Sequence, residues 1–90
     1  TELQSRRDHA YFQRETAANG AWLERLGVQL SFAGKRVLEI GCGHGALSVH
    51  AAQAGASSVL GIDLDDDRIA FAGANLKANF GKLQDRVRFQ

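Results

Sequence analysis

Three features of the sequence combine residue types that hold charged or hydroxyl-bearing ligands: Glu39, the turn Gly41-Cys42-Gly43-His44-Gly45, and Asp63. Alternating glycines allow positive φ angles and let a ligand come close to the backbone. Asp63 lies 22 positions after Gly41, and nucleotide-binding sequences place a ribose-binding acid at about that spacing. The alternatives are a tight turn that binds nothing, and an Asp63 that only caps the next helix, a role that Asp65 could fill better.

Glu39 helps to decide which ligand the turn would hold. Gly41, Gly43 and Ala46 satisfy the pattern G-x-G-x-x-G/A, so a nicotinamide or flavin dinucleotide has to be considered. Glu39, however, interrupts an apolar strand two residues before the turn, and residues that break a local rule are expected at functional sites. Its carboxylate would repel a pyrophosphate and would suit an ammonium or sulfonium group. The alternative is an ion pair with the neighbouring Lys35-Arg36.

The elements that must position these residues follow from apolar periodicity and from the glycines. The sequence predicts strands at Arg36–Ile40, at Ser58–Asp63 and from Val87 onward, and helices over Glu2–Asn19, Gly20–Leu30, Ala46–Ala54 and from Asp65 to a stop at Gly81. The expected buried stripes of the last two helices are Leu47, Ala51 and Ala54, and Ile69, Gly73, Leu76 and Phe80. This alternation predicts an α/β fold with a doubly wound, right-handed parallel sheet, Rossmann-like, whose ligands bind at the carboxyl ends of the strands.

Two segments make up the predicted domain organisation. Residues 1–34 form an N-terminal helical segment, and residues 35–90 form the first half of a Rossmann-like domain. The chain begins at Thr1 without an initiator Met and stops at Phe89-Gln90, inside a predicted strand. Because sheet edges are normally covered or blunted, we expect this to be the front half of a larger unit, truncated after the third strand.

Composition narrows the function classes. The chain has 11 Lys plus Arg against 10 Asp plus Glu, a net charge of +1, so it lacks the basic footprint of nucleic-acid or membrane binding. The single cysteine excludes an internal disulfide and a cysteine-rich zinc site, and the histidines lack metal-ligand spacing. No segment has the length of a membrane span or the pattern of a signal peptide, so the cytoplasm is the expected location.

The segment Val37–Gly45 resembles motif I of class I S-adenosylmethionine-dependent methyltransferases, and Val59–Leu64 resembles their second motif. The stretch Arg68–Asn79 is similar to the helix that usually follows, so the resemblance covers about Lys35 to Gln90. The family also places helices before the first strand, as predicted here. We therefore expect the N-terminal, S-adenosylmethionine-binding part of such an enzyme.

The resemblance implies a role for each residue of the predicted site. It implies that the glycine turn passes under the methionine and ribose portions, that Asp63 binds the ribose hydroxyls, and that Leu64 packs against adenine. Glu39 would reach toward the methionine amino group. The N-terminal helices can cover the cofactor, so Tyr11 or Trp22 would contact it in one interpretation. The favoured interpretation of both residues is that they are core or interface aromatics. The implied cofactor-binding residues are Glu39, Gly41, Cys42, Gly43, His44, Gly45, Asp63 and Leu64.

The expected reaction is direct transfer of the sulfonium methyl group to a nucleophilic acceptor, a small molecule or a protein, with nucleic acid disfavoured by charge but not excluded. In the family, catalytic and acceptor-reading positions follow the fourth strand, so no catalytic residue is assigned here. An NAD(P)-dependent oxidoreductase is one alternative, against which Glu39 and the lack of Lys or Arg in the turn argue. A non-catalytic cofactor-binding or scaffold domain is another, and no feature of the sequence excludes it.

Overall fold

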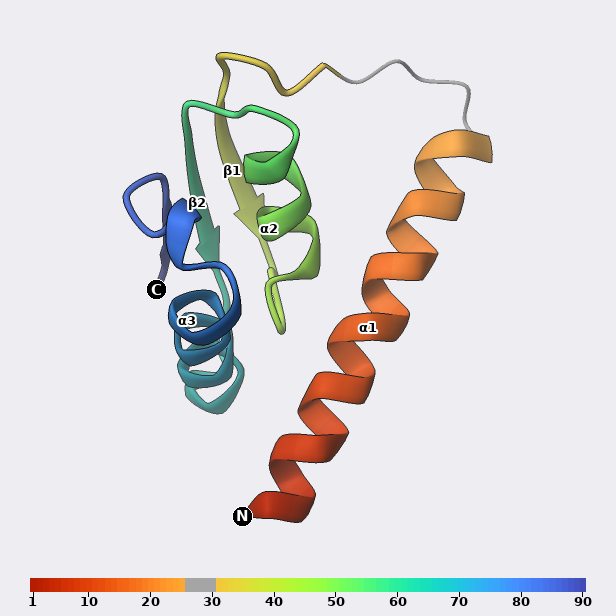
Figure 1. Cartoon of the computed structure of the whole chain (residues 1–90), viewed down its shortest axis with the longest axis vertical. Helices are drawn as coiled ribbons and strands as arrows, with labels where there is room; N and C mark the ends of the chain where they lie inside the picture. Colours follow the sequence, from red (N-terminus) through yellow and green to blue (C-terminus); the bar gives the residue numbers. More distant parts are fainter. Residues whose placement is uncertain (26–30) are drawn as a thin grey trace.

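The structure is a computed structural model that describes residues 1–25 and 31–90. Its elements alternate helix and strand after a long first helix (Figure 1). They are α1 (Glu2–Arg25), β1 (Arg36–Ile40), α2 (Ala46–Gln53), β2 (Ser58–Ile62), α3 (Asp66–Asn79), the short 3-10 helix η1 (Gly81–Leu83) and β3 (Val87–Phe89). The three strands and the two crossover helices confirm the predicted α/β fold.

The three strands form one parallel sheet in the order β1-β2-β3. Glu39 of β1 pairs with Gly61 of β2, and Gly61 pairs in turn with Phe89 of β3, so these residues share one face. Because the strands are parallel, the ends of β1 and β2 lie side by side. This register brings the turn that follows β1 next to Asp63, which follows β2.

The helices α2 and α3 cover the face of the sheet that carries Glu39 and Gly61. The core between them consists of small and branched apolar residues, namely Ala51, Ala52, Ala56, Val59, Leu76 and Val87. The expected stripe of α2 was partly wrong: Ala51 is buried, but Ala54 is exposed and Leu47 is half-buried, while Ser48 and Val49 face inward. In α3, Leu76 is buried as expected, together with Ala72 and Asn75.

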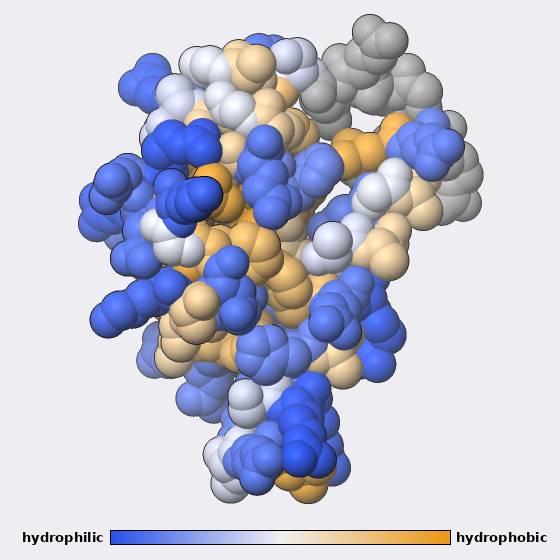
Figure 2. Space-filling view, in the orientation of Figure 1, coloured by the Kyte–Doolittle hydropathy of each residue, from blue (hydrophilic) through white to orange (hydrophobic). Residues whose placement is uncertain are grey.

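The opposite face of the sheet is open. Leu38 and Ile40 expose 59% and 78% of their surfaces there, which differs from the expectation of a strand buried on both faces. Figure 2, seen in the orientation of Figure 1, shows hydrophobic residues in the middle of this view and hydrophilic residues mainly along its left side. Because Leu38 and Ile40 are exposed, the helices α2 and α3 cover only one face of the sheet within the described residues.

One continuous helix, α1, stands where the sequence predicted two. It runs from Glu2 to Arg25 and passes through Gly20, because a single exposed glycine weakens a helix by only about 1 kcal/mol and does not end it. Residues 26–30, the end of the predicted second helix, lie outside the described residues. Phe12 anchors α1 against Ala46 and Val49 of α2. No helix in the described ranges is long and apolar enough to cross a membrane.

Gly61 offers a test of the packing between the sheet and α2. A Cβ at this position would lie 2.8 Å from Cδ1 of Phe89 and 2.9 Å from Oγ of Ser48. We expect Gly61→Ala to lower the free energy of unfolding by about 1–3 kcal/mol, measured by chemical denaturation of the full-length protein. The control is Gly73→Ala in α3, where a Cβ meets nothing within 4 Å and a gain of about 0.5–1 kcal/mol is expected. Equal effects of the two substitutions would contradict this packing.

Candidate functional site

The turn between β1 and α2 is held in shape by its own hydrogen bonds. Gly41, Gly43 and Gly45 have φ angles of 74°, 56° and 91°, as the alternating glycines predicted. The N–H groups of Gly41 and Cys42 both donate to the carbonyl oxygen of Ile62, at 2.8 and 2.9 Å, and Gly45 donates to Cys42 at 3.0 Å. The turn is therefore tied to the end of β2, and these three N–H groups are already in use.

Asp63 completes this connection between the strand ends. Its Oδ2 accepts a hydrogen bond from the N–H of Gly43 at 2.8 Å, and its Oδ1 accepts one from Asp65 at 2.9 Å. These bonds from Asp65 and Gly43 hold the pKa of Asp63 below its ordinary value, so the side chain is a carboxylate at neutral pH. Each carboxylate oxygen keeps a second lone pair that can accept a hydrogen bond from a hydroxyl group. The N-cap of α3 is Asp65, whose Oδ1 accepts from Asp67 and Arg68.

Glu39 points from β1 toward the helices. Its Oε1 accepts a hydrogen bond from the hydroxyl of Ser48 at 2.6 Å. Burial raises the pKa of Glu39 above its ordinary value, against the Ser48 hydrogen bond, and the negative charge of Glu15 raises it further. No salt bridge between described residues involves Glu39, so the ion pair with Lys35-Arg36 is not formed. The site therefore contains a partly desolvated acid that faces another acid instead of a cation.

Cys42 is a buried residue of the turn. Burial, together with the negative charges of Glu39 and Asp63, raises the pKa of its thiol to about 11. A thiol with this pKa is almost fully protonated at neutral pH, and the thiolate is the nucleophilic form. Cys42 is therefore not a nucleophile at neutral pH.

The glycines of the turn serve two different purposes. A Cβ on Gly41 or Gly43 would meet no protein atom within 4 Å, so the space beside both residues is open to a ligand. A Cβ on Gly45 would lie 2.7 Å from Cζ of Phe89 and 3.2 Å from Cβ of Ala72. Gly45 is thus required by its positive φ and by packing of the turn against β3 and α3, which the sequence did not reveal.

His44 connects the turn to α1. Its Nε2 lies 2.9 Å from Oδ1 of Asp8, and the His44 side chain is only 9% exposed. The ring also packs against Tyr11 and Phe71, with centroids 4.5 and 5.2 Å away. The partner Asp8 was not predicted from the sequence, since 36 positions separate the two residues.

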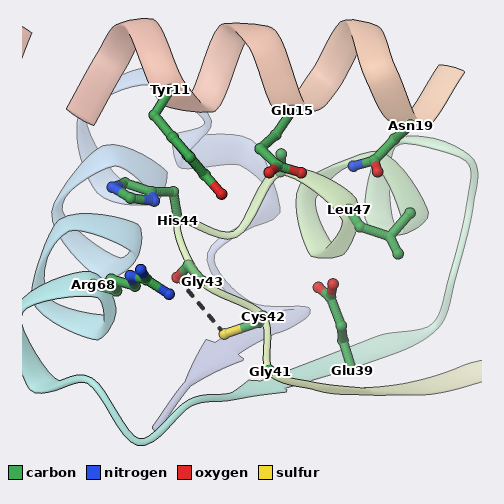
Figure 3. Close-up of a pocket in the computed structure, with 11 residues that line it drawn as sticks. Tyr11, Glu15, Asn19, Glu39, Gly41, Cys42, Gly43, His44, Leu47 and Arg68 are labelled. Carbon is green, nitrogen blue, oxygen red and sulfur yellow. Dashed lines mark hydrogen bonds between the residues drawn. The ribbon is translucent and has the colours of Figure 1, made fainter. Parts of the chain in front are cut away.

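Two pockets lie beside the turn and share Gly41. One, of about 440 Å³, is lined mostly by apolar atoms at the tips of β1 and β2. Its lining residues are Ile40, Gly41, Ile62, Asp63 and Leu64. The other, of about 120 Å³, lies between the turn and the helices, and Glu39 lines it (Figure 3). The structure thus brings the predicted acids and the turn together, with space for a ligand on both sides.

The smaller pocket also contains Glu15, Asn19 and Arg68, which the sequence did not assign to the site, together with Tyr11, which it did. The helix α1 contributes three side chains to this pocket, those of Tyr11, Glu15 and Asn19, and α3 contributes Arg68 (Figure 3). The three α1 residues recur every four positions, which places them on one face of the helix. This polar stripe is the sequence signal that could have identified them as part of the site. Tyr11 belongs to the pocket, whereas the side chain of Trp22 lies outside what the structure describes.

Comparison with known proteins identifies the family to which the chain is similar. The model of one family, ribosomal protein L11 methyltransferase (PrmA), matches residues 14–90. A protein named ribosomal protein L11 methyltransferase from Deinococcus radiodurans is 41% identical over 68 residues, which are 76% of this chain and 24% of that protein. A ubiquinone biosynthesis O-methyltransferase from Psychrobacter cryohalolentis is 44% identical over 62 residues, 69% of this chain and 23% of that protein.

A solved structure is also similar to this chain, and it too is a methyltransferase. The crystal structure of an S-adenosylmethionine dependent methyltransferase from Mesorhizobium loti superposes with a TM-score of 0.59 and 29% identity, covering 73% of this chain and 27% of that one. The chain therefore spans about a quarter of the length of these similar proteins.

The pair Asp8–His44 can be tested as the link between α1 and the turn. Because the pair is largely buried, we expect a coupling free energy of about 1 kcal/mol in a double-mutant cycle of Asp8→Ala and His44→Ala. The measurement is the free energy of unfolding of the full-length protein. The control cycle uses the exposed pair Glu2–Arg6, for which less than about 0.5 kcal/mol is expected. Equal coupling in both cycles would show that His44 does not anchor α1.

Proposed function

The chain belongs to the ribosomal protein L11 methyltransferase (PrmA) family, and from that premise we propose that it forms the S-adenosylmethionine-binding portion of a methyltransferase. The proposed binding residues are those of the sequence prediction: Glu39, Gly41, Cys42, Gly43, His44, Gly45, Asp63 and Leu64. The observation that carries this proposal is the placement of two carboxylates, Glu39 and Asp63, on either side of an open glycine turn.

The smaller pocket suits the methionine end of the cofactor. The carboxylate of Glu39 is partly desolvated and lies near a second acid, so a cation in this pocket would relieve the cost of its charge. An α-ammonium group supplies that cation. The pocket, about 120 Å³, is well below the roughly 300–1,000 Å³ of a whole ligand site, so it would take one end of the cofactor only.

The larger pocket suits the adenosine end. Asp63 stands at its edge with one free lone pair on each carboxylate oxygen, the arrangement that two neighbouring ribose hydroxyls need. Leu64 is fully exposed beside it and offers an apolar surface for the base. The path between the two pockets passes over Gly41, where no side chain obstructs a ligand.

The hydrogen bonds of the turn disfavour the oxidoreductase alternative. A dinucleotide site binds its pyrophosphate through free backbone N–H groups of the glycine turn. Here the N–H groups of Gly41, Cys42, Gly43 and Gly45 already donate within the protein, and Glu39 adds negative charge. No comparison with known proteins favours an oxidoreductase.

The cofactor, when bound, supplies a methyl group attached to a positively charged sulfur. The residues of this chain would hold its two ends and fix the direction of the methyl group, so their contribution is orientation. The two relatives are named differently, one for a ribosomal protein and one for ubiquinone biosynthesis, although both are more than 40% identical to this chain over the residues that they match. We therefore propose a small-molecule or protein acceptor, read by residues outside this stretch, and a cytoplasmic enzyme, in keeping with its balanced charge and free Cys42.

Asp63 gives the first test of the cofactor. We expect the full-length protein to bind S-adenosylhomocysteine in calorimetric titration and Asp63→Ala to weaken binding about tenfold or more, because bonds from hydroxyls to a carboxylate are lost. Asp66→Ala, which removes an exposed acid from the first turn of α3, is the control and should bind as the wild type does. Binding of NAD(H) instead would make the protein an oxidoreductase, and a folded protein that binds neither would favour the scaffold alternative.

Glu39 allows a test in which the directions of the changes in stability and in ligand affinity are both predicted. Its raised pKa means that its carboxylate destabilises the unliganded fold above the ordinary pKa of 4.5, so Glu39→Gln should raise the free energy of unfolding at neutral pH. The same substitution should weaken binding of S-adenosylhomocysteine at pH 7 by about tenfold, because the ammonium loses its counter-charge. In the wild type, affinity should fall as pH drops through the raised pKa, and the Glu39→Gln variant should lack that dependence. A variant that loses both stability and affinity would indicate a purely structural Glu39.

A further inference from the structure

A cleft of about 450 Å³ lies between α1 and α3, and it shares no lining residue with the two pockets beside the turn. Its walls come from one face of α1 and from the end of α3. On α1 the lining residues are His9, Phe12, Gln13 and Thr16. On the other side they are Asn75, Asn79 and the adjoining Phe80. This α1–α3 cleft is therefore a cavity that the proposed cofactor site does not use.

The α1–α3 cleft is lined by uncharged groups. None of its lining residues is Asp, Glu, Lys or Arg, whereas three of them carry side-chain amides, each of which both donates and accepts hydrogen bonds. Phe12 and Phe80 add apolar surface, and their ring centroids lie 5.9 Å apart. Because these rings already contact each other, no flat base can be held between them. The cleft thus suits a ligand that offers neutral donors and acceptors together with an apolar group.

Asn75 supplies hydrogen-bond donors to this cleft from a buried position. The residue is only 5% exposed, and its Oδ1 accepts a hydrogen bond from Nδ2 of Asn79 at 2.7 Å. Its own Nδ2 forms no hydrogen bond with another described residue, yet it is not sealed from the surface, since Nδ1 of His44 is the sealed side-chain atom without a partner. Buried N–H groups cost free energy until they meet an acceptor. Nδ2 of Asn75 therefore faces the cleft as a donor for a carbonyl oxygen.

A second cavity, of about 630 Å³, adjoins the cleft at Asn79 and Phe80, which line both. It contains Lys77, at the end of α3, and Lys82, in η1. Its lining includes no acidic residue, and neither lysine forms a salt bridge within the part of the chain that the structure describes. This lysine cavity gives the combined surface a basic end beside the uncharged cleft.

The dimensions and the charge of this surface fit an extended peptide. From His9 to Thr16 the α1 wall is about 10 Å long, at about 1.5 Å per residue, which equals about three residues of extended chain. A peptide backbone alternates C=O and N–H groups, the partners that side-chain amides need. A nucleic acid would require positive charge along its whole length, whereas the lysines lie at one end only.

We propose that the α1–α3 cleft and the lysine cavity together bind an extended segment of another protein. An uncharged stretch of that segment lies in the cleft, where Asn75 and Gln13 bind its backbone and an apolar side chain rests on the two phenylalanine rings. An acidic residue of the same segment lies beside Lys77 and Lys82. The inference goes beyond the proposed function, since it concerns a protein partner and no residue assigned to the cofactor.

The test compares matched peptides that differ only in charge. The acidic probe is a labelled, blocked peptide with a central leucine, a serine on each side and glutamates at both ends, so that it fits in either direction. The other probes carry glutamine or lysine in place of each glutamate. In fluorescence anisotropy titrations of the full-length protein, the acidic probe should bind about tenfold more tightly than the glutamine probe, and the lysine probe more weakly than both. The side-chain NH₂ signals of Asn75 should shift in NMR spectra as the acidic probe is added.

Variants assign the two parts of the surface separately. Lys77→Gln and Lys82→Gln should each weaken the acidic probe about threefold and leave the glutamine probe unchanged, because exposed charge pairs contribute little each. Gln13→Ala should weaken both probes about threefold, because a hydrogen bond to the peptide backbone is lost.

The controls are Lys35→Gln and Gln4→Ala, which change exposed residues of the same types outside both cavities and should alter no affinity. The inference is wrong if the acidic and glutamine probes bind equally well, if Gln13→Ala has no effect, or if the full-length protein binds none of the peptides. A single-stranded oligonucleotide that binds in a Gln13-dependent way where the peptides do not would make the surface one for nucleic acid, which also overturns it. Binding of S-adenosylhomocysteine is measured in parallel, so a failure of this inference and a failure of the proposed function are seen independently.

Discussion

The hydrogen bond from the N–H of Gly43 to the carboxylate of Asp63 is the contact on which the site depends. It joins the turn after β1 to the end of β2, across 20 positions of sequence, and it does so with a group that is itself proposed to bind the ligand. The same carboxylate accepts from Asp65, immediately before α3. One side chain thus sets the relative position of two strands, a helix start and the turn, so the geometry of the site is fixed before any ligand arrives.

The local parts of the fold, in contrast, could be predicted from the sequence. The turn between β1 and α2 could be read from the sequence because positive φ angles at Gly41 and Gly43 leave few other residues possible. The strands followed from short apolar runs between glycines, and Asp65 was foreseen as the N-cap of α3 because an acid before a helix has a known partner. In each case the determining interaction lies within a few residues of the pattern.

The parts that could not be predicted depend on contacts between distant segments. Nothing near Asp8 in the sequence indicates that it meets His44, and nothing near Ser48 indicates that its hydroxyl meets Glu39. Gly45 was correctly singled out for its backbone, but its contact with Phe89 required knowledge of how β3 packs. The continuity of α1 through Gly20 was missed for a different reason: packing against α2 supplies more free energy than one glycine removes.

The distribution of charge in the site distinguishes the kind of nucleoside that it suits. A dinucleotide carries negative charge at the centre of the molecule, where a glycine turn must offer free N–H groups, but this turn uses four of them internally. A sulfonium nucleoside carries its positive charges near the centre and at the amino-acid end, where this protein places Glu39 and Glu15. The cost of holding these two acids together in the unliganded protein then becomes a source of selectivity, because only a ligand with a cation at that end relieves it.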